Sequence, residues 1–269
     1  MNSTIFKHYV YFFNIKITAL VLLIGLGFSS CSEDLDDNLT PTIQITFKFT
    51  HHWDNEPVTN SSLNILQFTN ANGELLSIER LRYIISGIRF TNSANESFLL
   101  DSYNLVDLTS NKGLSYTVQT EIPEDTYSVS FTFGLNNEDN SENYVDLNSE
   151  SFNVPDMMGG GYHYMQFDGK FINTNSEEQG FNYHAIRAVD NAGTDPTSPQ
   201  DTFFTVNLGT ITVLNRTEIE VKMNIAEWFT NPNLWDLNEF NQMLMPNSAA
   251  QIMIYENGQS VFSLGEVTQ

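Results

Sequence analysis

The sequence predicts an all-β protein, with a single antiparallel β-sandwich-like domain, long loops and one or two short helices near the C-terminus. Aromatic residues are abundant, with 20 Phe and 11 Tyr in 269 residues, and ring side chains pack well on a half-buried pleated surface. Short apolar runs alternate with turn residues about every ten positions, which is typical of a sandwich or barrel. The length allows one large β domain or two smaller ones, and neither an internal repeat nor a linker marks a boundary after residue 40.

The first strand has the clearest pattern. Between Thr42 and Thr50 the apolar residues occupy the odd positions, which indicates a strand with one face against a core. The same parity directs His51 and Trp53 toward the core and His52 toward solvent. Residues 54–57 end the strand with Pro57, because proline cannot donate to a strand ladder.

The remaining elements follow from apolar runs and turn signals. Strands are expected at residues 63–68, 75–78, 78–90 (after one possible helical turn), 98–108, 115–120, 127–134, 202–206, 209–214 and 218–225. Asn72-Gly73 predicts a hairpin turn, and the acidic, Asn-rich residues 136–151 predict a long loop. Residues 226–245 predict a short helix or two, before a final hairpin that pairs 251–255 with 260–264 around Asn257-Gly258.

The central stretch from Gly159 to Arg187 contains two runs rich in Tyr, Phe and Met, and each run carries one histidine. A polar turn region separates the runs, so we expect two adjacent antiparallel strands. This pairing would bring His163 and His184 together.

The N-terminus has the layout of a secretory signal peptide. Lys7 and Lys16 precede the apolar run 17–28, and Ser29-Ser30 precede Cys31, the only cysteine. This run is shorter than the roughly 20 residues that a membrane-spanning helix needs. A small residue before a lone cysteine predicts a lipoprotein signal peptide at residues 1–30 with lipidation of Cys31. Residues 31–40 then form an acidic flexible tether and residues 41–269 the β domain.

The formal net charge is −22, and residues 1–30 contain two Lys and no Asp or Glu, so the rest of the chain carries −24. Such a field repels phosphate backbones and argues against nucleic acid as a partner. It also attracts cations, although scattered carboxylates serve equally to keep a secreted domain soluble.

Four histidines follow Cys31, and three of them, His51, His163 and His184, are candidate metal ligands. Neutral imidazole binds both copper and zinc, and a thioether-lined pocket favours Cu(I). Taken alone, each histidine can also be explained as a structural or surface residue with no role in metal binding. No nucleophile motif, phosphate-binding loop or dinucleotide fingerprint is present, so no catalysis is predicted.

Several motifs, in order and over residues 42–225, resemble the MbnP-like family, which is named for a methanobactin-associated periplasmic copper-binding protein. They are Phe47-x-Phe49-x-His51-x-Trp53-Asp-x-x-Pro57, Leu81-Arg-Tyr83-Ile-Ile-Ser86-x-Ile88-Arg-Phe90, Ile122-Pro-x-x-x-Tyr127-x-Val-x-Phe131-x-Phe-Gly134, Gly161-Tyr162-His163-Tyr-Met-Gln-Phe-Asp-Gly169 and Phe181-x-Tyr-His184.

The resemblance implies an all-β envelope domain that binds copper through histidines. It also implies, for some members, a Trp beside the site that a dihaem cytochrome c peroxidase-like partner oxidises to kynurenine. His184 matches the Phe-x-x-His motif and His163 lies in the Gly-Tyr strand. Related chains carry Met-x-Trp-x-Trp before that strand, whereas this sequence has residues 157–161 as Met-Met-Gly-Gly-Gly, which leaves Trp53 as a substitute.

These observations predict an outer-membrane lipoprotein, facing the periplasm or the cell surface, that binds copper through His51, His163 and His184 for metal acquisition or storage. The alternative is a surface module that binds glycans or proteins without metal, with Trp228, Trp235 and exposed Tyr residues as a stacking platform. A hydrolase would require two facing carboxylates in a cleft, and the 33 acidic residues supply too many candidates to rank.

Overall fold

The computed structural model describes residues 43–269, and these residues belong to one compact unit. The predictions for the signal peptide, Cys31 and the acidic tether therefore lie outside the described residues. The strands are β1 Ile43–Trp53, β2 Glu56–Val58, β3 Phe68–Thr69, β4 Leu75–Leu76, β5 Arg80–Asn92, β6 Ser97–Asp107, β7 Ser115–Thr120, β8 Asp125–Phe133, β9 Met165–Ile172, β10 Glu178–Ala185, β11 Phe204–Val213, β12 Arg216–Asn224 and β13 Phe262–Thr268. The helices are α2 Val145–Ser149 and α3 Ser248–Gly258, and the 3-10 turns are η1 Asn60–Ser62, η2 Asp139–Ser141, η3 Asp156–Met158 and η4 Ile225–Phe229.

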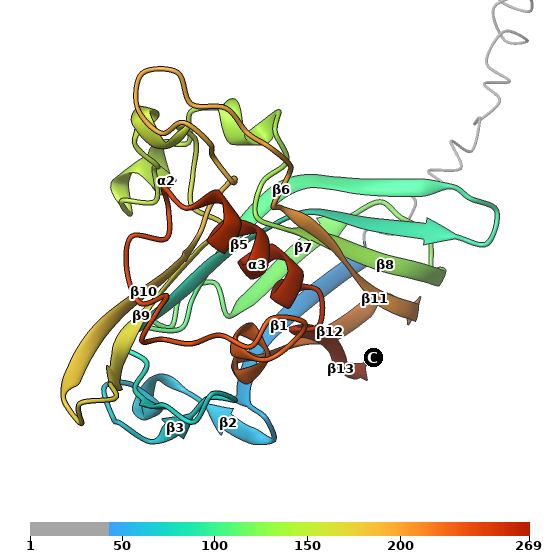
Figure 1. Cartoon of the computed structure of the whole chain (residues 1–269). Coiled ribbons are helices and arrows are strands. Elements are labelled where there is room, and N and C mark those ends of the chain that lie inside the picture. Colours follow the sequence, from blue (N-terminus) through green and yellow to red (C-terminus); the bar gives the residue numbers. More distant parts are fainter. Residues whose placement is uncertain (1–42) are drawn as a thin grey trace, which may run out of the picture. The chain divides into compact units, whose positions relative to one another are not determined.

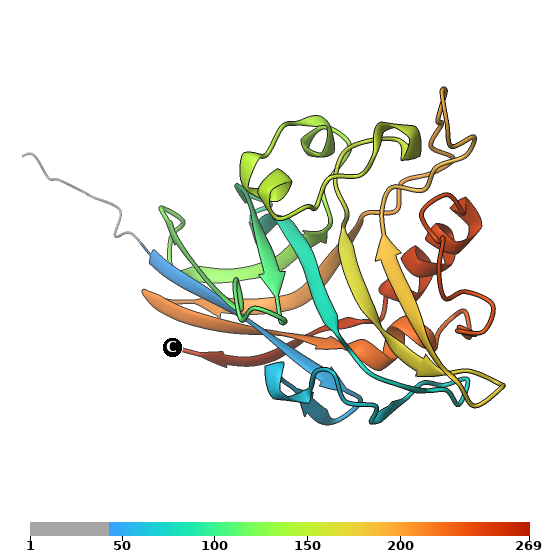
Figure 2. The same ribbon diagram turned by 90° about the vertical axis from the view of Figure 1, so that its left-hand side faces the viewer.

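The strands form two sheets (Figures 1 and 2). The smaller sheet has the order β13-β12-β1-β2, with β7 also paired to β1. The larger sheet has the order β11-β8-β5-β9-β4-β3, with β6 beside β5 and β10 beside β9. Strands β1 and β12 run parallel, whereas the other strand pairs are antiparallel. The predicted all-β, sandwich-like class is confirmed.

The main hydrophobic core lies between the two sheets and contains apolar side chains from both. Strand β1 alternates as its sequence predicts: Ile43, Ile45 and Phe47 are buried and the intervening side chains face outward. The alternation extends to Trp53, because β2 and β12 pair with the end of the strand.

A second, smaller core covers the outer face of the larger sheet. Ile84 points outward from β5 and packs with Leu135, Leu147, Phe152 and Tyr162. The segment between β8 and β9 supplies all of these except Ile84, so the predicted loop 136–151 is instead a packed segment that contains η2 and α2. It holds Phe152 and the residues before β9 against the sheet.

The predicted final hairpin is wrong. Residues 248–258 form α3, whose first turn is capped by the Asn247 side chain accepting from Ala250 N at 3.1 Å. Gly258 ends the helix where a Cβ would lie 2.6 Å from the Phe204 ring, so close packing requires this glycine rather than a hairpin turn. Strand β13 then pairs with β12.

Two smaller expectations also change. Residues 78–90 contain no helical turn, since β5 starts at Arg80. The strands expected at 202–206 and 209–214 are one strand, β11, interrupted by a bulge between Asn207 and Gly209. Among residues 43–269, no helix has the length and apolar character needed to cross a membrane.

Candidate metal site

The candidate site lies on the outer face of the larger sheet, where β5, β9 and β10 are neighbours. Cross-strand register aligns Arg80 with Asp168 and Asp168 with Asn182, and it aligns Gln166 with His184. The outward side chains here are Arg80 and Arg82 of β5, Gln166 and Asp168 of β9, and Asn182 and His184 of β10. The alternate residues Tyr83, Phe167 and Tyr183 point into the main core.

His184 is held by a carboxylate on the neighbouring strand. Its Nε2 lies 2.8 Å from Oδ1 of Asp168. The side chain of His184 is 13% exposed, so the ring reaches the surface at one edge. Because a carboxylate oxygen accepts, Nε2 carries the proton, and Nδ1 of the neutral ring carries the lone pair.

His163 lies just before β9 and is held by the backbone of the second core. Its Nδ1 donates to the Phe152 carbonyl oxygen at 2.8 Å, which leaves the lone pair on Nε2. Nε2 is buried and has no hydrogen-bond partner among residues 43–269. Burial, opposed by the hydrogen bond to Phe152 and helped by the positive charge of neighbouring groups, lowers the pKa of His163 to about 4.

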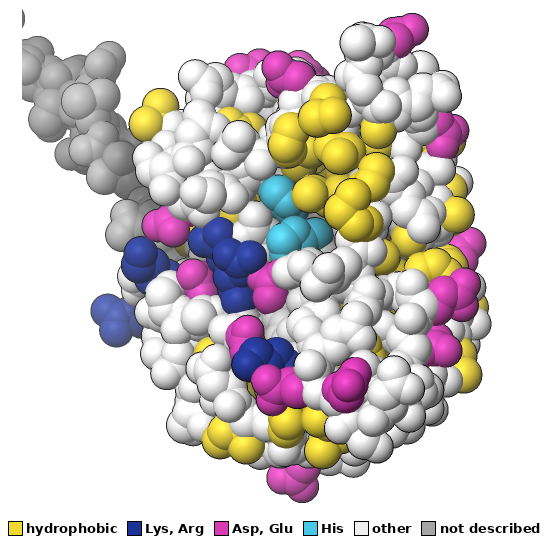
Figure 3. Space-filling model, turned by 60° about the vertical axis from the view of Figure 1, so that its left-hand side comes forward, with side chains coloured by type: hydrophobic (Ala, Val, Ile, Leu, Met, Phe, Trp, Pro, Cys, Tyr) yellow, Lys and Arg dark blue, Asp and Glu magenta, His cyan; other side chains and the backbone are white. Residues whose placement is uncertain are grey.

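The two imidazoles are in contact. The ring centroids of His163 and His184 lie 5.2 Å apart with the ring planes 85° apart. The predicted pairing of these two histidines on adjacent chain segments is therefore present in the structure. Figure 3 shows two adjacent histidine side chains at the surface, between a hydrophobic patch and a group of Lys and Arg side chains with their acidic neighbours.

Asp168 forms the centre of the polar network. Its Oδ1 accepts from Asn182 Nδ2 at 2.5 Å as well as from His184, and its Oδ2 forms an ion pair with Arg80 Nε. Burial alone would raise the pKa of this carboxyl. The hydrogen bond from His184, the charge of that ring when it is protonated, and the hydrogen bonds from Asn182 and Arg80 hold the pKa well below its usual range. Asp168 is therefore ionised at neutral pH.

Arg82 ties the loop before His163 to the sheet. Its Nε donates to Gln166 Oε1 at 2.8 Å and its NH2 to the Glu150 carbonyl at 2.9 Å. The guanidinium also lies over the Phe152 ring, 5.0 Å from the centroid. This contact fixes the segment whose carbonyl accepts from His163.

The structure does not bring His51 into this pair. His51 points inward from β1, as its parity predicts, and its Nε2 lies 3.1 Å from the Tyr83 hydroxyl. Tyr83 is on the inner face of the larger sheet, whereas His184 is on the outer face, so the sheet separates the two imidazoles. In the described part of the chain, no group of three or more His, Cys, Asp and Glu side chains is arranged to hold a metal ion.

His163 also differs from its expected surroundings. Met165 and Phe167, which share the parity of His163 in the sequence and would lie on its face in a regular strand, belong to the main core. A bend at Tyr164 interrupts the alternation before β9 begins, and His163 consequently joins His184 on the outer face. The thioether-lined pocket expected around it is not formed by Met165.

The three tryptophans are core residues. Trp228 and Trp235 are fully buried, so they cannot serve as the exposed stacking platform of the alternative prediction. Trp53 stacks on Phe68 with ring centroids 4.9 Å apart and packs against Phe229. It lies on the inward side of β1, like His51.

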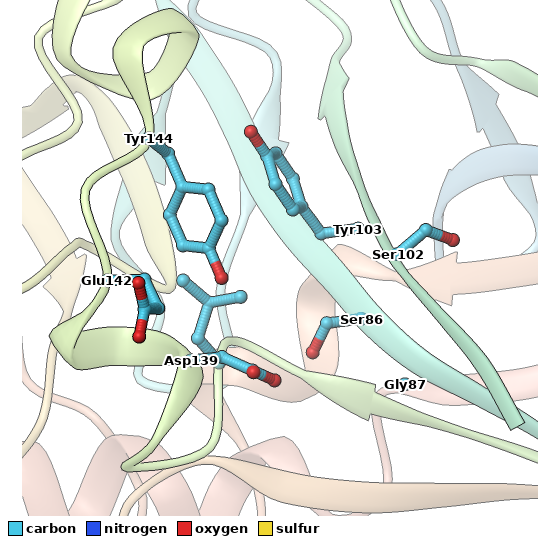
Figure 4. A pocket seen from close by; sticks show the side chains of 8 residues that line it. Ser86, Gly87, Ser102, Tyr103, Asp139, Glu142 and Tyr144 are labelled. Carbon is cyan, nitrogen blue, oxygen red and sulfur yellow. The ribbon is translucent and has the colours of Figure 1, made fainter.

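A cavity of about 500 Å³ lies elsewhere on the outer face of the larger sheet, between β5, β6 and the segment after β8. Figure 4 shows Tyr103, Tyr144, Asp139 and Ser86 around it. The Tyr103 hydroxyl donates to Asp146 at 2.5 Å and Ser86 donates to the Gly134 carbonyl at 2.6 Å. These hydroxyls are thus engaged in the fold itself.

The fold and the site together define a two-sheet β protein with a pair of contacting histidines on its outer face. The family model for MbnP matches residues 42–248, and the chain belongs to the MbnP family. Among solved structures, it is similar to MbnP from Methylosinus trichosporium, with a TM-score of 0.51 and 11% sequence identity over 83% of this chain and 98% of that chain. At this identity the likeness shows a shared fold. No curated protein matches the sequence.

The polar residues around the histidines were not among the predicted site residues. Arg80, Asp168 and Asn182 each occupy the outward parity of a strand whose inward positions are aromatic or aliphatic. The alternation in the sequences of β5, β9 and β10 predicts that these three side chains face the same side as His184. The order of the strands in the sheet, which makes them neighbours, cannot be obtained from this alternation.

Proposed function

We propose that this protein binds copper through His163 and His184, and that it acquires or holds the metal at the cell envelope without catalysing a reaction. The observation that carries the proposal is the buried Nε2 of His163. It has no hydrogen-bond partner in the described part of the chain, and its ring is in contact with His184. A buried polar atom without a hydrogen bond is unfavourable unless a water or a bound ligand satisfies it.

The hydrogen bonds of both rings fit metal coordination. A histidine that ligates a metal usually donates its other N–H to a carboxylate or a backbone carbonyl. Asp168 and the Phe152 carbonyl supply these two acceptors. Each imidazole therefore keeps a lone pair for a cation, and the lowered pKa of His163 keeps that ring neutral at physiological pH.

Imidazole nitrogens bind copper and zinc alike, so the donors alone do not select the metal. Membership of the MbnP family supports copper. The net charge of −22 favours the approach of any cation. Because two imidazole nitrogens of the described residues meet here, we propose that solvent or a partner supplies other ligands of the metal.

The cellular setting is also a proposal. A lipid on Cys31 would anchor the protein to the outer membrane, facing the periplasm or the cell surface, with residues 31–40 as the tether. Family resemblance supports a dihaem cytochrome c peroxidase-like partner where a tryptophan beside the site is oxidised. The buried position of Trp53, away from the histidine pair, favours a site without an oxidised tryptophan.

Elemental analysis of the purified protein after exposure to Cu(I), Cu(II) and Zn(II) tests the proposal, alongside His163→Ala and His184→Ala. We expect nearly one copper per chain in the wild type and a loss of that copper in both variants. His52→Ala is the matched control, because His52 faces outward from the other sheet and hydrogen-bonds only locally with Thr50. Wild-type protein that retains no copper, or variants that retain all of it, would overturn the proposal.

A further inference from the structure

We propose that Asp168 is a positioning residue that fixes the tautomer of His184, so that the Nδ1 lone pair of His184 is available to a metal. The inference rests on the proposed function for its consequence, but the tautomer itself is a property of the metal-free protein. It begins from the 2.8 Å contact between His184 Nε2 and Asp168 Oδ1.

Asp168 cannot easily turn away from His184. Both of its oxygens have partners, since Oδ1 also accepts from Asn182 and Oδ2 pairs with Arg80. The residue is 8% exposed, and water therefore competes little for these hydrogen bonds. Three donors from two neighbouring strands hold the carboxylate in one orientation.

No other side chain in the network replaces Asp168 as the acceptor. Gln166 is the residue directly opposite His184 in the strand register. However, its Oε1 accepts from Arg82 and its Nε2 donates to the Ser151 carbonyl at 3.1 Å. The choice of tautomer at His184 consequently depends on Asp168.

The tautomer decides whether His184 can be a ligand on the side away from Asp168. With the proton on Nε2, Nδ1 offers a lone pair, whereas a proton on Nδ1 would make that nitrogen a donor that cannot bind a cation. Partners of this kind typically change metal affinity about 10-fold to 100-fold when they are removed. We expect an effect of that size here.

The substitution Asp168→Asn should reverse the tautomer. The guanidinium of Arg80 only donates, so it will bind the amide oxygen of the new side chain. The amide NH2 then faces both His184 and Asn182. Asn182 turns its side-chain amide so that its oxygen accepts, and the NH2 also donates to Nε2 of His184, which moves the imidazole proton to Nδ1. We expect 15N-histidine NMR of the metal-free protein at pH 8 to show His184 protonated on Nε2 in the wild type and on Nδ1 in Asp168→Asn.

A double variant separates positioning from a general structural role. In the double variant Arg80→Met/Asp168→Asn the guanidinium that bound the amide oxygen is gone. The amide can therefore rotate, and its oxygen can accept from His184 Nε2. We expect the wild-type tautomer to return, together with most of the copper affinity lost in Asp168→Asn. Glu178→Gln is the matched control, because Glu178 is an exposed carboxylate of β10 that pairs with Lys170, and it should change neither readout.

The outcomes distinguish this inference from the proposed function. An unchanged His184 tautomer in folded Asp168→Asn would overturn the inference, even if copper affinity fell. A reversed tautomer with copper affinity reduced about 10-fold to 100-fold would support it. Wild-type protein that binds no copper would overturn the proposed function, whereas a reversed tautomer in the metal-free variant would still support the positioning role of Asp168.

Discussion

His51 and Tyr83 form a hydrogen-bonding pair inside the main core, with 3.1 Å between Nε2 and the hydroxyl oxygen and the two rings in an edge-to-face arrangement. Tyr83 belongs to β5, the strand that also carries Arg82 on its opposite face. One strand therefore separates a structural histidine from the candidate metal site. His51 was predicted from the sequence to be a metal ligand, whereas in the structure it packs in the main core.

We expect His51→Gln to leave copper binding unchanged. Glutamine can keep a hydrogen bond to Tyr83, but it loses the edge-to-face ring contact, which is worth about 1 kcal/mol in aromatic pairs. The free energy of unfolding should fall by about 1–2 kcal/mol. Copper titration and urea unfolding of the same preparation measure both quantities. Loss of copper in a folded variant would return His51 to the ligand set.

Acidification should destabilise the protein before its carboxylates titrate. Burial, with a smaller contribution from His52, lowers the pKa of His51 to about 3, and burial is also the main cause that lowers the pKa of His163 to about 4. In the unfolded chain these rings bind protons near pH 6.5. Below that pH the unfolded state binds more protons than the folded state, so the free energy of unfolding falls as the pH falls.

Each of these two histidines should lower the free energy of unfolding by about 2 kcal/mol when the pH falls from 7 to 5. Their contribution is fully present above about pH 6.5 and decreases toward the folded-state pKa values of about 3 and about 4. Urea unfolding at intervals of half a pH unit measures the slope. His51→Gln should have about half the wild-type slope in this window. An unchanged slope would show that His51 is not the neutral, buried ring described here.

Particular residues show how far the sequence alone could lead. The alternation of β1 and the pairing of β9 with β10 were predictable, because one buried face imposes a period of two. His163 and His184 were therefore correctly expected to meet. The position of His51 relative to these two histidines was not predictable. Parity tells on which face of its strand a residue lies, but it does not tell which face of the other sheet packs against that residue.

Tertiary packing decided the remaining differences. Asn257-Gly258 is a hairpin signal in isolation, but Gly258 is the residue where the end of α3 approaches Phe204 and Trp228. In the sequence, nothing distinguishes Asp168 from the rest of the 33 acidic residues. In the structure, the strand register places it between Arg80 and His184. A long-range contact of this kind has no local signature.

Gly161→Ala should destabilise the segment next to His163. Gly161 has φ +76°, and a Cβ there would lie 2.7 Å from the Asn140 carbonyl oxygen and 2.6 Å from its side-chain nitrogen. Backbone strain and overpacking together should cost about 3 kcal/mol. Gly193→Ala is the control, because Gly193 has φ +141° but an added Cβ meets no atom within 4 Å, so only the strain applies. Equal losses in the two variants would show that the contact with Asn140 relaxes freely.

Arg82→Lys should loosen the loop that holds His163. Lysine lacks the planar fork with which Arg82 reaches Gln166 and the Glu150 carbonyl, and it stacks less well on Phe152. We expect the amide of His163, which donates to the Phe152 carbonyl at 2.8 Å, to exchange its hydrogen at least about 10-fold faster, as a local loss of about 1.4 kcal/mol implies. Hydrogen exchange followed by mass spectrometry measures this change.

Arg89→Lys is the matched control for that experiment. Arg89 lies on the same strand, is exposed, and donates to the Ser97 hydroxyl at 3.0 Å. Its substitution should leave exchange at residues 150–163 as in the wild type. Equal acceleration in both variants would assign the effect to strand β5 as a whole rather than to the contacts of Arg82.

Gln251→Leu should weaken the attachment of α3 to the end of β10. The buried amide of Gln251 accepts from Ile186 N at 2.8 Å and donates to the carbonyl oxygens of His184 at 2.9 Å and Leu244 at 3.1 Å. Leucine fills a similar volume but removes all three of these hydrogen bonds. Although the Leu244 carbonyl still accepts from Asn247 N at 3.1 Å, the free energy of unfolding should fall by about 3 kcal/mol. Gln259→Leu, at an exposed position just after α3, should change it by less than about 0.5 kcal/mol. Similar losses in both variants, measured by urea unfolding, would show that the helix itself and not its contact with the strand determines the effect.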